Sequence, residues 1–295
     1  MRRMWVRDLR NGLLFISLWI AGFLAFTCYP ILASLYYSFT DFNIVSPEGP
    51  QWVGLLNIRE MLFEDYLFWI SLYNTAYFAF GFLFTATLFD VAIAVLLNLD
   101  IRARSFYRTV YFLPVLVPSV AAAIVWVWVL NPQRGLLNHL LSLVGIPGPN
   151  WLASVEWVKP ALVLMAVWHS GRAIIIYLAG LQEIPRHLYE AARIDGANAL
   201  QLLRFVTLPL LSPVIFFNVV VGLIGAFQYF TEAYIMTRGG PANASMFYSL
   251  HLYFQAFENL RMGYASSLAW CLFLIILLLT LLTFQFSRRL VHYER

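Results

Sequence analysis

Six long apolar segments constrain the fold of this 295-residue chain more than any other feature. A helix needs about 20 mostly apolar residues to cross the hydrocarbon core of a bilayer. The segments that meet this requirement are Leu13–Phe39, Leu72–Leu97, Tyr107–Leu130, Pro160–Gln182, Pro209–Thr231 and Tyr264–Phe286. Their apolar runs are continuous and do not alternate with polar residues, which is typical of helices and not of a transmembrane barrel. The sequence therefore predicts an all-α integral membrane protein with six transmembrane helices.

The composition excludes several other classes of protein. Charged residues make up 12% of the chain, about half the share of a typical soluble domain. Disordered proteins, collagen-like fibres and ordinary globular enzymes do not have such a composition. The two cysteines, Cys28 and Cys271, both lie inside apolar runs, so we expect neither a disulfide nor a metal site. The net charge of +4 comes from arginines placed at the ends of spans, so we expect no nucleic-acid partner.

The distribution of basic residues predicts the orientation in the membrane, because cytoplasmic loops carry the excess of Lys and Arg. Thirteen of the 19 basic residues lie in the two ends of the chain and in the second and fourth connections, and five lie in the other connections. Both termini are therefore predicted to be cytoplasmic. The apolar run after Met1–Arg10 is longer than a signal-peptide core, so we expect an uncleaved first span.

The predicted domain organisation follows from these spans. Residues 1–12 and 287–295 form the cytoplasmic ends, and residues 13–286 form one six-helix membrane domain that includes a cytoplasmic loop at 183–208. Pro114 and Pro118 are predicted to kink the third span near its start, and Pro30 to kink the first.

The loop at 183–208 has the pattern of two short helices joined at a glycine. Pro185 suits the first turn of a helix, and the stretch from Arg186 to Asp195 is rich in helix-forming residues. Gly196 can adopt the left-handed conformation that ends such a helix. One face of the first helix carries residues spaced three and four apart, which are Leu188, Ala191, Ala192 and Asp195. The alanines make this face shallow, and Glu190 beside it offers a carboxylate to a partner's arginine.

This pattern resembles the E-A-A-x3-G-x9-I-x-L-P signature of permease subunits of binding-protein-dependent ABC importers. The matching residues are Glu190, Ala191, Ala192, Gly196, Leu208 and Pro209, with Val206 in place of the usual isoleucine. Three further stretches resemble the carbohydrate branch, the maltose, lactose and glycerol-phosphate type: Phe106–Pro114, Ala179–Pro185 and Met236–Ser245.

The resemblance implies a MetI-like permease fold in which the 183–208 loop is the coupling helix that docks on a cytoplasmic ATPase. It also implies an assembly of two homologous permeases, two ATPase subunits and one extracytoplasmic sugar-binding protein, in a bacterial cell (inner) membrane. The ATPase must be a separate chain, because a phosphate-binding loop needs Gly-Lys followed by Ser or Thr. The only lysine here, Lys159, follows Val158. We therefore expect no cofactor on this chain, with ATP-Mg bound by the partner, and no enzymatic activity.

The same resemblance points to a substrate path on the fourth and fifth spans. The residues concerned are Trp168, Ser170, Gly171, Phe227, Gln228, Tyr229 and Phe230. Aromatic faces and a few polar groups suit a sugar, although rings in an apolar span also serve for packing.

Two charged residues inside the spans form a further hypothesis. Asp90 and Arg172 lie about 12 Å and 16 Å from the cytoplasmic ends of their helices at 1.5 Å per residue. Because buried charges are costly in a membrane, they are predicted to form an ion pair between spans two and four. Snorkelling by Arg172 and a polar-lined cavity at Asp90 are the alternatives.

Three other functions stay open at this point. The cargo can be glycerol 3-phosphate or another polyol or sugar ester instead of a sugar, since Arg172 favours an anion. The chain can also be an ion-coupled secondary transporter, although such proteins string several carboxylates or histidines through their spans. A membrane-embedded enzyme is disfavoured, because the sequence has no His-Glu-x-x-His motif and no aspartate pair inside a span.

Overall fold

The computed structural model describes residues 2–100 and 102–290, with side chains from residue 12 to residue 287. This part of the chain is helical and contains no strand, only an isolated bridge between Thr40 and Trp52. The α-helices are α1 (Arg2–Phe23), α2 (Tyr29–Tyr37), α3 (Leu56–Phe63), α4 (Tyr66–Asn98), α5 (Arg104–Phe112), α6 (Ser119–Val129), α7 (Leu136–Leu143), α8 (Val158–Trp168), α9 (Gly171–Glu183), α10 (Arg186–Ile194), α11 (Ala199–Leu202), α12 (Leu208–Phe227), α13 (Thr231–Met236), α14 (Tyr248–Tyr253) and α15 (Met262–Leu290). The shorter helical turns are η1 (Leu24–Cys28), η2 (Leu113–Leu116), η3 (Leu203–Thr207) and η4 (Phe254–Glu258). The predicted all-α fold is confirmed.

Four helical segments are long and apolar enough to cross a membrane: Gly12–Tyr37, Tyr66–Asn98, Ala199–Met236 and Met262–Ser287. Two further spans are bent pairs of helices, α5 and η2 with α6, and α8 with α9. Counted this way, the described residues contain up to six spans, each at a place where the sequence predicts one.

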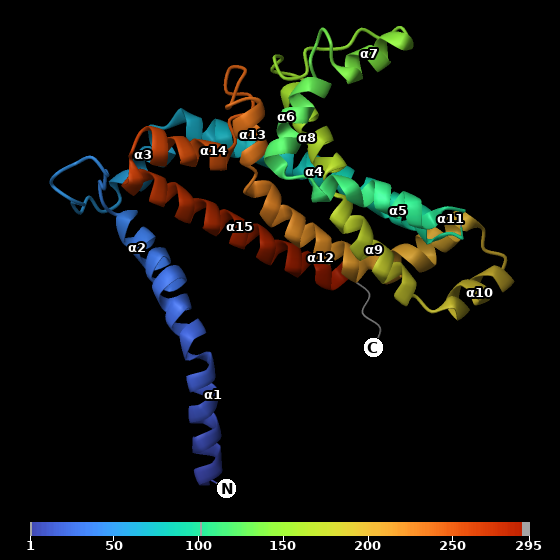
Figure 1. Ribbon diagram of the computed structural model, residues 1–295, viewed down its shortest axis with the longest axis horizontal. Helices are drawn as coiled ribbons and strands as arrows, with labels where there is room; N and C mark the ends of the chain where they lie inside the picture. The colour runs from blue at the N-terminus through green and yellow to red at the C-terminus, as the bar shows by residue number, and fades with distance from the viewer. Residues whose placement is uncertain (1, 101, 291–295) are drawn as a thin grey trace. The chain divides into compact units, whose positions relative to one another are not determined.

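The third span is broken and not merely kinked. Its two halves meet at 102° on either side of Val117, and Figure 1 shows α6 rising steeply from α5. Val117 is extended, with ψ of 125°, because the ring of Pro118 disfavours helical geometry in the preceding residue. The predicted kink at Pro118 is thus confirmed. Pro30 instead follows the π-helical turn η1, which runs into α2 without a break in the helix.

The fourth span bends by 48° between α8 and α9, which the sequence did not predict. The Ser170 hydroxyl donates to the Val167 carbonyl at 2.6 Å, a side-chain bond that competes with the helical backbone pattern. A Cβ at Gly171 would meet the carbonyl oxygen of Tyr111. Glycine therefore allows the start of α9 to lie directly against α5.

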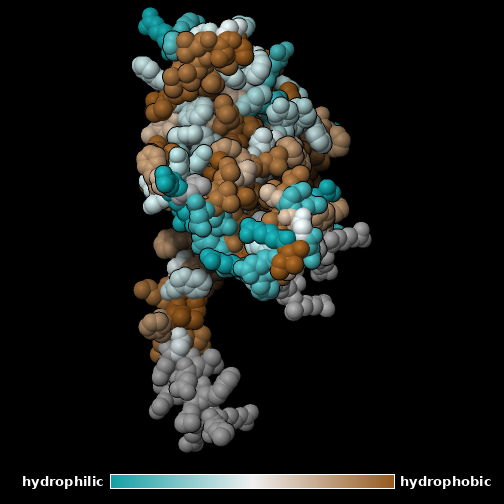
Figure 2. Space-filling view, turned by 90° about the vertical axis from the view of Figure 1, so that its right-hand side faces the viewer, coloured by the Kyte–Doolittle hydropathy of each residue, from teal (hydrophilic) through white to brown (hydrophobic). Residues whose placement is uncertain are grey.

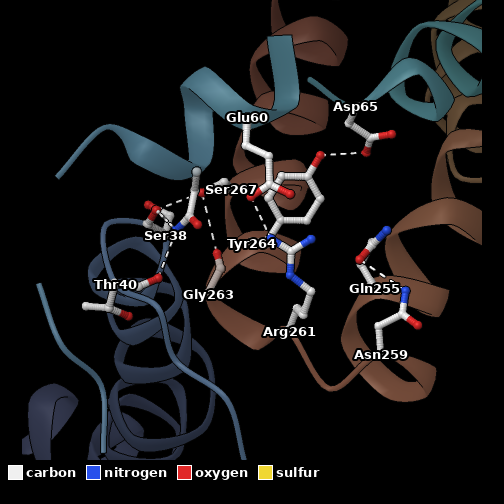
Figure 3. Close-up of polar contacts among 11 residues, drawn as sticks. Ser38, Thr40, Glu60, Asp65, Gln255, Asn259, Arg261, Gly263, Tyr264 and Ser267 are labelled. Atoms are coloured by element: carbon white, nitrogen blue, oxygen red, sulfur yellow. Dashed lines mark hydrogen bonds and ion pairs between the residues drawn. The ribbon is translucent and has the colours of Figure 1, made fainter. Parts of the chain in front are cut away.

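Residue contacts group the chain into two compact units, and the first comprises residues 1–65 and 252–271. Asn57 is buried there, and its amide donates to the carbonyls of Ser38 and Thr40 at 2.9 and 2.8 Å. The Ser267 hydroxyl donates to the same Ser38 carbonyl at 2.7 Å. These bonds hold the end of the first span to α3 and to the start of α15 (Figure 3).

A charged cluster joins α3 to the start of α15 in the same unit. Arg261 donates to Glu60 at 2.6 Å and lies over the Tyr264 ring at 4.6 Å. The Tyr264 hydroxyl donates to Asp65 at 2.6 Å (Figure 3). Gly263 is required beside them, because a Cβ there would collide with the Thr40 carbonyl.

The second unit comprises residues 66–251 and 272–295 and is organised around α4. This helix packs against α8, α9 and α12 (Figure 1). Its core cluster consists of Ala94, Leu97, Ile174, Tyr177, Leu178, Leu181, Ile184 and Leu211. The core therefore lies where α4, α9 and α12 meet, next to the 183–208 loop.

The stretch Met236–Ser245, which contains the turn Gly239-Gly240-Pro241, and the residues that follow it are held to α4. The Asn74 amide donates to the carbonyls of Asn243 and Met246 at 2.8 and 3.1 Å. The Tyr248 backbone N–H donates to the Thr75 hydroxyl at 2.8 Å, and Lys159 donates to the Asn74 side chain at 3.0 Å. Buried polar side chains thus satisfy the backbone of this irregular turn.

Candidate functional site

The segment from Ile184 to Thr207 forms an elbow of two short helices, α10 and α11. Figure 2 shows hydrophilic side chains gathered where α10 and α11 lie, next to a largely hydrophobic surface. Gly196 has φ of +85°, and its N–H and that of Ala197 donate to the carbonyls of Arg193 and Ala192. This is the Schellman arrangement that ends a helix. The predicted helix end at Gly196 is confirmed.

The second arm of the elbow starts with a capping box. The Asn198 side chain accepts from the Gln201 N–H at 2.9 Å, and the Gln201 side chain accepts from the Asn198 N–H at 2.8 Å. Both otherwise unpaired N–H groups at the helix start are thereby satisfied. The arm then continues through η3 into α12 without interruption.

The inner side of the elbow packs on the core cluster, whereas its outer side is exposed. The Tyr189 hydroxyl lies 3.1 Å from the Thr207 hydroxyl, and the Tyr189 side chain packs on the core cluster. Glu190, Ala191 and Asp195 are exposed. Of the other predicted coupling residues, Leu208 is exposed, Gly196 is exposed at the turn, and Ala192, Val206 and Pro209 are half-buried.

Two exposed apolar side chains on this outer side were not among the predicted coupling residues. Ile194 is 87% exposed and Leu200 is 71% exposed. Phe205, which is 68% exposed, adds to the apolar surface that the elbow leaves bare. In the sequence the first two are recognisable only as an isoleucine and a leucine on either side of the Asp195–Asn198 turn.

Two cavities of about 290 Å³ each lie along the bundle of α4, α8, α9 and α12. The first is mostly apolar and aromatic, with Phe78, Met165 and Tyr229 in its wall and Glu232 at one side. The second is more polar and contains Asp90, Arg172 and Asn218. Both are lined by Phe82, His169, Ser170 and Gly222, so the cavities adjoin at the break in the fourth span.

Asp90 is 2% exposed, and its partner differs from the predicted one. Its carboxylate accepts a hydrogen bond of 2.7 Å from the Ser170 hydroxyl. Among the described residues no ion pair joins Asp90 to Arg172, whose side chain is exposed. Both residues line the second cavity, so the alternative of a polar-lined cavity at Asp90 describes the structure better.

The predicted substrate-path residues separate into two groups. Ser170 and Tyr229 line a cavity, and Tyr229 stacks on Phe78 at 4.2 Å. The Tyr229 hydroxyl is buried and has no hydrogen-bond partner among the described residues. The other five predicted residues line neither of the two cavities. They are Trp168, Gly171, Phe227, Gln228 and Phe230. Trp168 packs on Trp126, Phe227 is buried, and Phe230 stacks on Tyr234.

Comparison with known families agrees with this architecture. Residues 90–292 match the family described as "Binding-protein-dependent transport system inner membrane component". The chain belongs to this family. The matched region contains the whole elbow and the cavity-lining residues from Asp90 onward, and it leaves out α1 to α3 and most of α4.

Individual relatives cover nearly the whole chain. The "Probable ABC transporter permease protein YesP" of Bacillus subtilis (strain 168) is 41% identical over 98% of this chain and 94% of its own length. The "Lactose transport system permease protein LacF" of Rhizobium radiobacter is 34% identical over 94% of each. A chain in the crystal structure of a bacterial ABC transporter involved in the import of the acidic polysaccharide alginate superposes with a TM-score of 0.83, at 25% identity, covering 98% of this chain and 100% of that chain.

Proposed function

We propose that this chain is the membrane-spanning permease subunit of an ATP-driven importer of mono- or oligosaccharides. It forms half of the translocation path and couples to a separate ATPase subunit. The observation that carries the proposal is the elbow, whose exposed Glu190 and Ala191 match the family signature and whose bare Ile194 offers an apolar contact. Membership of the family and the lactose transport relative support this function.

The elbow suits the transmission of force. Tyr189 of α10 packs on the core cluster of α4, α9 and α12, and its hydroxyl contacts Thr207 next to the start of α12, so a partner that moves α10 also moves helices that line the cavities. Each ATPase subunit binds ATP-Mg, and this chain binds no cofactor. In this proposal no bond is made or broken by the permease.

The two cavities suit a carbohydrate cargo. Sugars are bound by aromatic faces together with a few polar groups that fix the hydroxyls. The first cavity supplies the stacked rings of Phe78 and Tyr229, with a buried hydroxyl that lacks a partner. The second supplies the Asp90 carboxylate and Asn218. Buried polar groups without partners are rare, so the Tyr229 hydroxyl is the best candidate contact.

The proposed assembly contains a second homologous permease, two cytoplasmic ATPases and an extracytoplasmic sugar-binding protein. It lies in the bacterial cell (inner) membrane, with both termini and the elbow in the cytoplasm. The excess of arginines in the two ends of the chain and the connections after α4 and α9 supports this orientation.

Disulfide crosslinking tests the coupling role. In a chain with Cys28 and Cys271 replaced by alanine, Ala191→Cys is expected to crosslink to a cysteine in the ATPase cleft. Ala153→Cys, which is exposed in the loop before α8, serves as the matched control and should give no such product. Absence of any crosslink from Ala191→Cys in the complete, transport-active complex would contradict the proposal, as would sugar uptake by the chain without an ATPase.

Uptake of labelled sugars tests the cargo. Tyr229→Phe removes only the unpartnered hydroxyl, so KM for the sugar is expected to rise about tenfold, the cost of one neutral hydrogen bond. Protein abundance and ATPase activity without cargo should stay unchanged. An unaltered KM across a panel of transported sugars would refute the assignment of this hydroxyl.

One observation favours a second candidate cargo. Arg172 lines the second cavity and has no ion-pair partner among the described residues, so it can contact the anionic group of glycerol 3-phosphate or of an acidic sugar. Arg172→Gln would then abolish uptake of the anionic compound and spare neutral sugars. Equal effects on both would rule out this role.

A further inference from the structure

Helix α5 is the first half of the broken third span. The bend of 102° between α5 and α6 means that the two cannot both follow the membrane normal (Figure 1). One side of α5 packs on the bundle, where the Tyr111 carbonyl meets the start of α9. The opposite side is bare, with Phe106 64% exposed and Val110 47% exposed. Only the start of α5, which follows the end of α4 after a short turn, therefore lies near the headgroups, and its bare apolar side faces the lipid.

Two arginines of this helix keep buried N–H groups without a partner, although the Nη2 of Arg104 donates to the Asn98 side chain at 3.4 Å. Arg104 and Arg108 are four residues apart, so they lie on the same face of α5. The Nε atom of Arg104 and the Nε and Nη2 atoms of Arg108 are buried without a hydrogen-bond partner in the described chain. Burying an N–H group without a hydrogen-bond partner costs free energy, and the cost is larger when the group is charged. Both side chains are only half-buried, so a ligand can approach them from outside.

The neighbouring acidic residue does not neutralise this pair. Asp100 lies 4.0 Å from Arg104, but its side chain is fully exposed, and exposed ion pairs contribute little. Arg102 adds a third positive charge nearby. Like charges four residues apart on a helix repel each other, so an anion between the two guanidinium groups would relieve repulsion and satisfy the unpaired N–H groups.

We propose that Arg104 and Arg108 bind the phosphate group of an anionic phospholipid in the cytoplasmic leaflet. A guanidinium group offers paired donors that match two phosphate oxygens. Phe106, Tyr107 and Val110 then rest on the same leaflet, as aromatic and apolar side chains do at headgroup depth. The choice of leaflet rests on the orientation given under the proposed function, whereas the lipid site itself does not depend on coupling to an ATPase.

The test measures lipid binding by the intact transporter complex. The complex is placed in bilayer discs of phosphatidylcholine alone or of seven parts phosphatidylcholine to three parts phosphatidylglycerol, and retained lipids are counted by native mass spectrometry. Arg108→Gln should weaken phosphatidylglycerol binding about fivefold, and the double variant with Arg104→Gln about 25-fold, taking the usual contribution of one arginine near an anionic surface. Arg134→Gln, an exposed arginine after α6, is the control and should change nothing.

A stability measurement separates a lipid site from a purely structural role. Phosphatidylglycerol should raise the melting temperature of the wild-type chain and not that of Arg108→Gln, while the two should melt alike in phosphatidylcholine. Arg108→Lys keeps the charge and loses the paired donors, so it should retain part of the effect. Equal destabilisation of Arg108→Gln in both lipids would overturn the proposal, because the partner would then be protein. Displacement of the lipid by inorganic phosphate would overturn it in favour of a soluble anion.

Discussion

Replacing Arg261 by methionine tests whether the cluster at the start of α15 stabilises the fold. Methionine has a similar length but carries neither the charge nor the donors, so the contact to Glu60 and the position over Tyr264 are both lost. The Glu60 carboxylate accepts a hydrogen bond from Arg261, which raises the pKa of Arg261 above its ordinary value. The pair is therefore fully charged below that ordinary pKa, and its contribution disappears only as pH rises through the raised one.

The expected magnitude follows from the geometry. A hydrogen bond between charged groups contributes about 1.5–3 kcal/mol, and partial exposure of the two side chains, 41% and 28%, reduces it to about 1 kcal/mol by solvent screening. The position over the aromatic ring adds about 0.5–1 kcal/mol. Arg261→Met should therefore lower the free energy of unfolding by about 1.5–2 kcal/mol. For a chain of this size, that corresponds to a melting temperature about 3–8 °C lower.

The assay is thermal unfolding in detergent, followed by tryptophan fluorescence. Combined with Glu60→Gln, a double-mutant cycle should give a coupling energy of about 1 kcal/mol. Arg59→Met is the control, because Arg59 lies 3.9 Å from Glu64 with both side chains mostly exposed, and it should change little. The reasoning is refuted if the two methionine variants melt alike, or if the deficit of Arg261→Met vanishes at mildly alkaline pH.

Three further predictions concern the second unit. Gly171→Ala drives a methyl group into a neighbouring backbone carbonyl and should cost about 1–3 kcal/mol of stability, whereas Gly22→Ala has open space and should be neutral or stabilising; equal melting temperatures for the two would contradict the close packing. Ser170→Ala removes the hydrogen bond to the buried aspartate and should cost about 1 kcal/mol, while Arg172→Gln should not; the reverse order would restore the predicted ion pair. Asn198→Ala removes the capping box and should cost about 1 kcal/mol, seen as faster amide exchange at the start of α11, and unchanged exchange would count against it.

The sequence was most informative where a local rule decides the structure. Continuous apolar runs located all six spans, since length and hydrophobicity alone determine whether a helix can cross a bilayer. The helix end at Gly196 and the break at Pro118 were also predictable, because each depends on the backbone preference of one residue.

The remaining features depend on contacts between distant residues. The break at Ser170 could not be predicted, because serine is common inside membrane helices and the close packing of Gly171 involves the Tyr111 carbonyl, 60 positions away in the sequence. The predicted ion pair between Asp90 and Arg172 rested on their similar depths in the membrane. Depth does not determine the direction in which a side chain points, and Asp90 is hydrogen-bonded to Ser170 instead. Of seven predicted substrate-path residues, two line the two cavities described above, because a ring in an apolar span packs or faces a cavity according to neighbours that one sequence does not reveal.

The two ends of the elbow differ in backbone structure, and this bears on the proposed coupling. On the α9 side the chain is extended at Ile184 and Pro185, which makes a pivot. On the other side, α11, η3 and α12 follow one another directly and form a continuous helical segment from Ala199 to Phe227. This segment is about 40 Å long at 1.5 Å per residue. In the proposed coupling, a push on the elbow would turn the chain at Ile184 and Pro185 and would reach, along α12, Gly222, which lines both cavities.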